Sequence, residues 1–224
     1  MPSICKQEIP GGWTSQKIKV AGKIFDLIVP AVPDELLDDL WKHDTEPIDW
    51  IDPFWSQIWP AAIPTATAIL QSKWDHQTKV LELGTGIGLV GLAALARGLD
   101  ATLSDYIPQS VDLAVENARR NGFENVRGTV LDWRQPVGEQ FPFILASDVL
   151  YDAKNHDSLL NLLKRMLTNE GVCWIGDPGR YHLASFVTLA RSSGFKVQLR
   201  GSKGERFSQP RSGEFQIVEL SRAA

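Results

Sequence analysis

The chain has little cysteine: Cys5 and Cys173 are the two cysteines among its 224 residues. They lie far apart in the sequence, and two cysteines cannot staple a fold of this size with disulfides. We therefore expect a reducing, cytoplasmic setting. The four histidines are scattered without the spacing of metal ligands, so we expect no metal site.

Long apolar runs and a strong net charge are also missing. The longest apolar stretches, such as AAIPTATAIL (61–70), are short and interrupted by proline, so we expect no membrane span. The N-terminal sequence MPSICKQEIPGGW has neither the apolar core of a signal peptide nor an arginine-rich amphipathic pattern. A formal net charge of -4 predicts no general attraction to nucleic acid or to anionic membranes.

Strand-like and helix-like segments alternate from about Thr78 onward. Helical patterns separate the strand-like segments, and Pro108 suits the first turn of one of these helices. The expected strands are 79–84, 101–105, 125–133, 141–150 and 171–177. Continuous apolar strands that alternate with helices predict a parallel sheet covered on both faces.

The last two strand-like segments have a different pattern. FKVQLR (195–200) and EFQIVEL (214–220) alternate with period two around a polar loop, which predicts an antiparallel hairpin. The predicted fold is therefore α/β, with a Rossmann-like, seven-stranded, mostly parallel sheet, helices on both faces and a C-terminal antiparallel hairpin. Residues 196–211 carry five Lys or Arg against one Glu, which indicates a solvated loop or a contact for an acidic protein partner.

We expect a short N-terminal extension at residues 1–60, packed on a main domain at residues 61–224. KIKVAGKIFDLIVP (17–30) predicts a two-stranded hairpin, and VPDELLDDLWKHD (32–44) predicts a short helix that starts at Pro33. Four of the eight tryptophans lie close together ahead of the main domain, which indicates a structured aromatic surface. They are Trp41, Trp50, Trp55 and Trp59.

A glycine-rich loop follows the first main-domain strand, in LELGTGIGLVG. Ligands of open α/β sheets bind at the carboxyl ends of the strands, where glycines let the backbone come close. A dinucleotide fingerprint counted from Gly84 would need its third glycine at the position of Leu89, so an oxidoreductase is disfavoured. The observed pattern is E-x-G-x-G-x-G, formed by Glu82, Gly84, Gly86 and Gly88.

That pattern is typical of S-adenosylmethionine (SAM) methyltransferases, in which the carboxylate at the strand end faces the positive amino group of the ligand. A plain tight turn between strand and helix is the alternative. Asp105 ends the second strand, where it can accept hydrogen bonds from both ribose hydroxyls. Asp132 and Trp133 end the third, where a carboxylate can contact the adenine amine and an indole can pack on the ring. Three neighbouring strands ending in Glu82, Asp105 and Asp132 favour SAM as the ligand.

With further motifs, these residues resemble the seven-strand (class I) SAM-dependent methyltransferases, and within them the "methyltransferase-like" protein-lysine branch. The motifs run in chain order from Pro53 to about Gly179: FWSQIWPAA, VLELGTGIGLVGLAAL, LSDY, LDW and ASDVLYD. IGDPGR (175–180) and the paired tryptophan motif FW…WPAA are most similar to enzymes that methylate the electron-transfer flavoprotein β subunit. Bacterial relatives of that subgroup are often labelled nicotinamide N-methyltransferase-like.

The resemblance implies roles for individual residues. Asp148 and Tyr151 match the D-x-x-Y motif that the branch uses at the substrate amine, and Ser147 takes a position that often touches the cofactor. Further residues are implied to surround SAM: Trp59, Gly84, Thr85, Gly86, Asp105 and Trp133. Core packing for Trp55 and Trp59 stays open as an alternative role.

Methyl transfer needs a neutral amine about 3 Å from the methyl carbon, so positioning and desolvation do most of the catalysis. We expect Asp148 to accept a hydrogen bond from the amine, and Tyr151 to form a wall of the channel. Neither is expected to be a strong general base, because a carboxylate near its reference pKa is a poor proton acceptor. Alternatively, Asp148 caps a helix, and Tyr151 is an ordinary half-buried aromatic residue. Asp152 is expected at a helix start, and Asp177 with Arg180 in a local ion pair.

The expected activity is SAM-dependent N-methylation of an amine, with a protein lysine as the leading acceptor. A small-molecule amine, enclosed by the N-terminal segment, is the second possibility. A catalytically silent SAM-binding module is the third, against which the intact Asp148 and Tyr151 argue. Enzymes that methylate the exocyclic amines of bases usually carry N/D-P-P-Y/F where this chain has DVLY, so nucleic acid is not an expected partner. We expect a monomer without a membrane partner.

Overall fold

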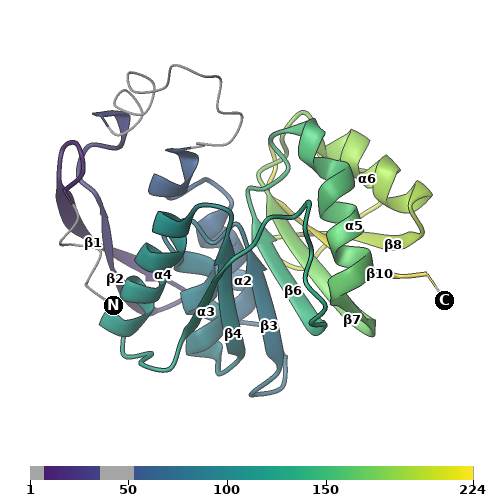
Figure 1. The fold of residues 1–224 in the computed structure, drawn as a ribbon. Helices are drawn as coiled ribbons and strands as arrows, with labels where there is room; N and C mark the ends of the chain where they lie inside the picture. The colour runs from purple at the N-terminus through teal and green to yellow at the C-terminus, as the bar shows by residue number, and fades with distance from the viewer. Residues whose placement is uncertain (1–7, 36–52, 224) are drawn as a thin grey trace.

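The computed structural model describes residues 8–35 and 53–223, and a large sheet lies at its centre (Figure 1). The strand order is β5-β4-β3-β6-β7-β10-β8-β9. Five strands are parallel: β3 (Lys79–Leu83), β4 (Asp100–Asp105), β5 (Arg127–Val130), β6 (Phe141–Ser147) and β7 (Leu167–Asp177). The predicted α/β fold is confirmed.

The C-terminal strands complete the sheet in antiparallel fashion. β10 (Gln216–Arg222) lies between β7 and β8 (Phe195–Gly201) and pairs with both, which confirms the predicted hairpin. The two-residue strand β9 (Arg206–Phe207) adds an eighth strand at the edge, beyond the seven that the sequence predicts. Its pattern is too short to be recognised from alternation.

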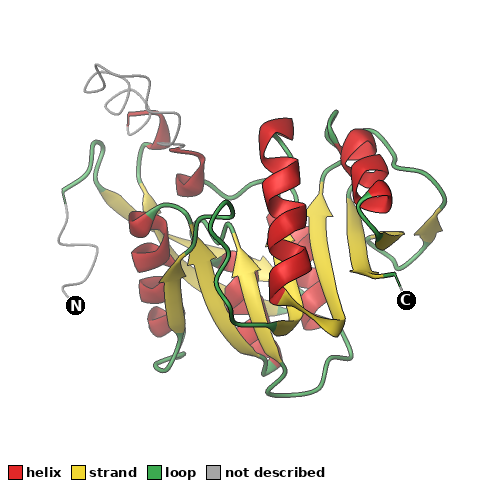
Figure 2. Cartoon of the chain, turned by 45° about the vertical axis from the view of Figure 1, so that its right-hand side comes forward, coloured by secondary structure: helices red, strands yellow, loops and turns green. Residues whose placement is uncertain are grey.

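Helices cover both faces of the sheet (Figure 2). The core on one face includes α2 (Ala62–Leu70), α3 (Leu89–Arg97) and α4 (Pro108–Arg120). The core on the other face includes α5 (His156–Met166) and α6 (Leu183–Ser192). Successive side chains of a strand serve the two cores in turn, as Val80 and Leu81 do in β3. Each central strand is therefore apolar on both sides.

A small N-terminal sheet packs beside α4 (Figure 1). It consists of β1 (Trp13–Val20) and β2 (Lys23–Pro30), which confirms the predicted hairpin. The buried side chain of Asn117 accepts a hydrogen bond from Ile28 N–H (2.6 Å) and donates to the carbonyls of Ile28 (3.0 Å) and Ile87 (2.9 Å). One α4 residue thus ties the hairpin to the glycine loop. The division at residue 60 stays a prediction.

Two strands end three residues earlier than the sequence predicts. The third main-domain strand stops at Val130, because Asp132 forms a turn in which its carboxylate accepts a hydrogen bond from Arg134 N–H (2.9 Å). The fourth stops at Ser147, because Asp148 adopts a left-handed φ of 62°. Both changes of direction bring polar side chains to the carboxyl edge of the sheet.

Some expectations concern residues that lie outside the described part of the chain. Most of the helix expected over 32–44 does so, as do Trp41 and Trp50. Within residues 8–35 and 53–223, no helix is long and apolar enough to cross a bilayer. The same residues contain no group of three or more His, Cys, Asp or Glu placed to hold a metal ion.

Candidate active site

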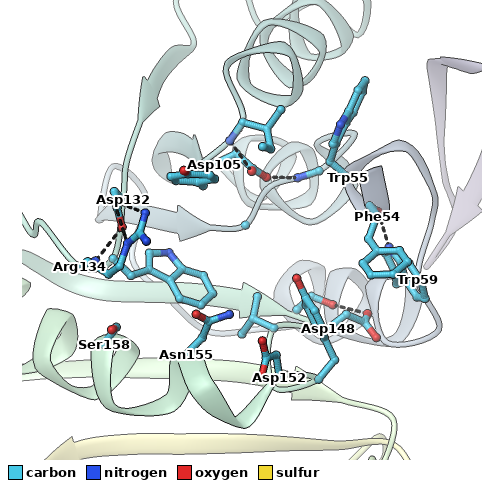
Figure 3. A pocket seen from close by; sticks show the side chains of 18 residues that line it. Phe54, Trp55, Trp59, Asp105, Asp132, Arg134, Asp148, Asp152, Asn155 and Ser158 are labelled. Carbon is cyan, nitrogen blue, oxygen red and sulfur yellow. Dashed lines mark hydrogen bonds and ion pairs between the residues drawn. The ribbon is translucent and has the colours of Figure 1, made fainter. Parts of the chain in front are cut away.

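A pocket of about 270 Å³ opens at the carboxyl edge of the parallel strands (Figure 3). Residues from the ends of β3, β4 and β6 line it, together with the short 3-10 helices η2 (Pro53–Ser56) and η3 (Ala153–Asn155). Nine of the twelve predicted site residues belong to its lining: Trp59, Gly84, Gly86, Asp105, Asp132, Trp133, Ser147, Asp148 and Tyr151. Glu82, Thr85 and Gly88 are not part of that lining.

Two glycines of the glycine loop line the pocket, and the third lies against the core. Gly84, Gly86 and Gly88 all have positive φ, at 64°, 53° and 94°, which glycine adopts without strain. A Cβ atom at Gly86 would lie 3.2 Å from the Trp55 carbonyl oxygen. At Gly88 it would lie 3.0 Å from Ala114 in α4. Gly84 and Gly86 therefore line the pocket with backbone alone, without side chains that would fill it, whereas Gly88 lets α3 and α4 pack closely.

Glu82 lies beneath the loop, with 3% of its surface exposed. Its carboxylate accepts hydrogen bonds from the Thr85 hydroxyl and from Gly91 N–H in the first turn of α3. A Cβ atom at Gly91 would lie 2.3 Å from Glu82 Oε2, so glycine leaves the room that this carboxylate occupies. Glu82 thus binds the N-terminal turn of α3, and its predicted contact with a ligand amino group stays a prediction.

Burial raises the pKa of Glu82 to about 8, although the bonds from Thr85 and Gly91 oppose the shift. The folded chain then binds this proton more tightly than the unfolded chain, in which the pKa is 4.5. The free energy of unfolding should therefore fall as the pH rises from about 4.5 to about 8. Glutamine mimics the protonated form of Glu82. We therefore expect the free energy of unfolding of Glu82→Gln to fall by a few kcal/mol less than that of the wild type over this pH range.

Urea unfolding of both proteins at pH 5, 6.5 and 8 measures this difference. The pKa of Asp105 and that of Asp148 are also raised, chiefly by burial. Both residues remain in the variant, so the difference between the two proteins reports Glu82 together with its coupling to Asp105. Glu124→Gln, at an exposed position, is the control and should follow the wild type. Parallel pH dependences of Glu82→Gln and the wild type would contradict the prediction.

Asp105 connects the end of β4 to the glycine loop. One carboxylate oxygen accepts a hydrogen bond from Gly86 N–H (3.0 Å), and the other accepts one from Ile107 N–H (3.1 Å). Ser110 in α4 adds a bond to the Gly86 carbonyl (3.0 Å). Burial raises the pKa of Asp105, and these backbone donors lower it. The Ser110 side chain and the Tyr106 N–H also lower this pKa, so a ligand hydroxyl would share these oxygens with protein donors.

Asp132 is already paired within the protein. Arg134 binds its two oxygens through Nε (2.9 and 3.0 Å) and Nη2 (2.8 Å), and these bonds lower the pKa of the carboxyl. The guanidinium also lies over the ring of Tyr106, 5.5 Å from its centroid. Arg134 and Tyr106 line the pocket beside Trp133 and were not predicted. The contact of Asp132 with an adenine amine stays a prediction.

Asp148 lies at the other side of the pocket, near Phe54 and Trp59 (Figure 3). Its Oδ2 accepts hydrogen bonds from Ala61 N–H (2.9 Å) and from the Ser147 hydroxyl (3.0 Å), while its own N–H donates to the Gly176 carbonyl (2.9 Å). Burial raises the pKa of Asp148, and the charge of Arg180 opposes this shift. A carboxylate held at this many points is fixed in place.

Asp152 has the helix-start role expected for it. Its side chain accepts a hydrogen bond from Lys154 N–H (2.9 Å) at the start of η3. The alternative in which Asp148 caps the following helix is therefore wrong. Asp152 also belongs to the pocket lining, so it adds a negative charge to the site.

Aromatic rings form the wall beside Asp148. Phe54 contacts Trp59 edge to face, with ring centroids 5.4 Å apart, and contacts Tyr151 at 5.9 Å. The Trp59 indole donates to the Phe54 carbonyl (2.6 Å). Trp55 packs against the core as well as lining the pocket, so the two roles considered for it coexist. Phe54 was not predicted as a site residue, although it lies in the same FW…WPAA motif.

Arg180 forms the expected local ion pair with Asp177 and a second, shorter one that was not predicted. Asp177 does form the expected local turn, and its Oδ1 accepts the N–H groups of Gly179 and Arg180, both at 2.8 Å. The guanidinium, however, lies 2.7 Å from Asp148 and 3.7 Å from Asp177. The main ion pair is therefore long-range. It forms because β6 and β7 are neighbours whose ends meet, with Ser147 beside Gly176.

The chemistry of the pocket fits SAM. Four carboxylates and one guanidinium line it: Asp105, Asp132, Asp148, Asp152 and Arg134. This excess of negative charge suits a cationic sulfonium and amino group, and it would repel a pyrophosphate. The glycine backbone, the Asp105 acceptors and the indole of Trp133 supply groups that suit a nucleoside.

Comparison with known proteins agrees with a pocket for SAM. A family described as lysine methyltransferase matches residues 49–185. The chain is 30% identical to a histidine protein methyltransferase 1 homolog of Dictyostelium discoideum, over 56% of this chain and 43% of that protein. It is 28% identical to the electron transfer flavoprotein β subunit lysine methyltransferase of Xenopus laevis, over 67% of this chain and 63% of that protein.

The structural comparison concerns the fold. A TehB-like SAM-dependent methyltransferase from Corynebacterium glutamicum superposes with a TM-score of 0.60 at 20% identity, over 71% of this chain and 87% of that one. The chain spans roughly half the length of the relatives matched by sequence, with coverages of 43% and 63%.

Proposed function

This chain belongs to the lysine methyltransferase family, and from that premise we propose that it uses SAM to methylate a lysine side chain of a protein. The observation that carries the proposal is one continuous pocket with two chemically different sides. The glycine loop and Asp105 form the side that suits a nucleoside. Asp148, Phe54 and Tyr151 form the side that suits an amine.

When bound, SAM supplies an electrophilic methyl group. The backbone of Gly84 and Gly86 would lie against the cofactor, and Asp105 would accept hydrogen bonds from its hydroxyls. Trp133 would pack on the base. These residues would hold the donor, so that the side of the pocket beside Asp148 remains for the acceptor.

The substrate amine must lose a proton before it can accept the methyl group. A lysine with a pKa of about 10.4 arrives almost wholly protonated at neutral pH. Asp148 would accept a hydrogen bond from the incoming amine at Oδ2, which already accepts bonds from Ala61 and Ser147, because Oδ1 is buried against Arg180. The ring of Tyr151 would attract the cation and shield it from water. Tyr151 is 43% exposed, so the proton can leave to solvent at the pocket mouth.

Two experiments test the proposal. Calorimetry should show affinity for S-adenosylhomocysteine (SAH) and none for NAD, and the reverse result would overturn the cofactor assignment. Incubation of the protein with methyl-labelled SAM and a cell extract should label a protein band that yields methyllysine on hydrolysis. Label found only in small metabolites, or as methylhistidine, would overturn the choice of acceptor.

We also propose that the chain acts as a monomer in the cytoplasm, without a nucleic-acid or membrane partner. The sequence features that support this are the two cysteines and the modest net charge of -4. Light scattering coupled to size-exclusion chromatography measures the oligomeric state, and a dimer at micromolar concentration would contradict it.

A further inference from the structure

Arg180 crosses from the turn after β7 to the acid at the end of β6. Its Nη1 lies 2.7 Å from Asp148 Oδ1, and the two side chains are 21% and 5% exposed. Solvent and salt screen the attraction between two charges this close and this shielded much less than they screen a surface pair. Arg180 is not part of the pocket lining, so it supports Asp148 from behind.

The conformation of the turn after β7 fixes the direction of the Arg180 side chain. The fully buried Asp177 accepts the N–H groups of Gly179 and Arg180. Gly179 has a φ of 85°, and a Cβ atom there would lie 2.5 Å from the Arg211 carbonyl. The Gly179 carbonyl accepts a hydrogen bond from Gly213 N–H (2.9 Å). The guanidinium lies over Trp59, 5.8 Å from the ring centroid. Backbone and side chain are thus both fixed.

Without Arg180, Asp148 would be a poorer acceptor for the substrate amine, for two reasons. Burial raises its pKa, and Arg180 is the largest opposing influence, so without Arg180 the acid would hold a proton nearer to neutral pH. Once ionised and unpaired, it would stabilise the ammonium form of the substrate and raise the pKa of the amine. Either change leaves less neutral amine beside an ionised Asp148.

We propose that Arg180 is a positioning residue of the acceptor site, which acts through Asp148 and does not touch the amine. It keeps the Asp148 carboxylate ionised in the orientation that receives the amine, and it cancels part of the negative charge that would otherwise hold the amine as an ammonium ion. Asp177, at 3.7 Å, is the second acceptor of the guanidinium. This inference rests on the proposed function.

Other charged groups also lie near Asp148 and contribute to the electrostatic potential at its carboxylate. Asp177 faces Arg180 from the end of β7, and Asp105, Asp132, Asp152 and Arg134 line the same pocket as Asp148. Asp132 is neutralised by Arg134. Among the described residues, Arg180 is the one cation that forms an ion pair with Asp148. Its removal should therefore alter the Asp148 site much more than any other single change of a basic residue.

The first test is the pH dependence of kcat/KM in the wild type, Arg180→Met and Arg180→Lys. We expect Arg180→Met to lower kcat/KM at pH 7.5 by about tenfold, because the carboxylate is no longer held in place, and to move the limb that reports ionisation of Asp148 to higher pH. Arg180→Lys, which restores the charge, should recover most of the shift. Arg127→Met removes a matched ion pair with Asp100 (2.8 Å) at the far edge of the sheet and should keep the wild-type profile.

The second test does not depend on turnover. The Asp148 carboxyl can be followed by carbon-13 NMR in SAH-bound protein, and it should titrate at higher pH in Arg180→Met than in the wild type, with SAH affinity kept within about threefold. If Arg180→Met does not fold, Arg180→Gln replaces it. An unchanged titration and an unchanged pH profile would overturn the inference. A wild type with no methyl transfer to any acceptor would overturn the proposed function, whereas the titration would still decide the role of Arg180.

Discussion

Asp148→Asn is expected to lower kcat by about a hundredfold or more, because a group that contacts the reacting amine is removed from the acceptor side. Asparagine tolerates the left-handed conformation that Asp148 adopts, with its φ of 62°. Its carbonyl oxygen can still accept the bond from Ala61 N–H. The variant therefore keeps the bond to Ala61, but its NH₂ group faces the Arg180 guanidinium, so it loses both the charge that attracts the amine and the pairing with Arg180.

Alanine at this position would be a poorer test. It would strain the left-handed backbone and leave the Ala61 N–H and the Arg180 guanidinium without their acceptor. The matched control is Asp157→Asn, an exposed acid in the first turn of α5, which should keep normal turnover.

Turnover with the labelled protein substrate and SAH affinity by calorimetry together decide the role of Asp148. We expect the affinity of Asp148→Asn to stay within a few-fold of the wild type, because the cofactor side is built from other residues. Turnover within threefold of the wild type would remove Asp148 from the acceptor site. An equal loss of affinity and turnover would make it a structural support of the whole pocket.

The local features of the fold could be predicted because each depends on neighbouring residues. The apolar run of β3 and the glycines after it are contiguous, and the left-handed φ of Gly84, Gly86 and Gly88 is what such spacing indicates. The direction of the Glu82 side chain could also have been found. Glu82 shares a face of β3 with Val80, which belongs to the core under α3, and period two places its carboxylate there.

The long-range contacts could not be predicted in the same way. Asn117 bonds Ile28 across 89 positions of sequence, and nothing local distinguishes it from other polar helix residues. Arg180 reaches Asp148 because β6 and β7 end side by side, whereas the sequence shows only that Asp177 is three residues before it. Ion pairs between neighbouring strand ends become visible only when the strand order is known.

Asp105→Asn is expected to reduce the affinity for SAH by about a hundredfold. Both Asp105 oxygens accept backbone N–H groups, from Gly86 and Ile107. The amide of asparagine must turn its NH₂ group toward one of these donors, so one buried N–H loses its acceptor, at a cost of about 1–3 kcal/mol. The glycine loop then loses its anchor to β4, and the ligand hydroxyls lose an ionised acceptor.

Calorimetric titration with SAH measures this loss. Asp100→Asn, at the other end of the same strand and paired with Arg127, is the matched control and should keep wild-type affinity. The melting temperature separates the two contributions. The loop anchor is present without ligand, so its loss should lower the melting temperature of the free protein. The lost hydroxyl contact should appear only as a smaller rise of that temperature when SAH is added. Wild-type affinity in Asp105→Asn would contradict the placement of the cofactor against the end of β4.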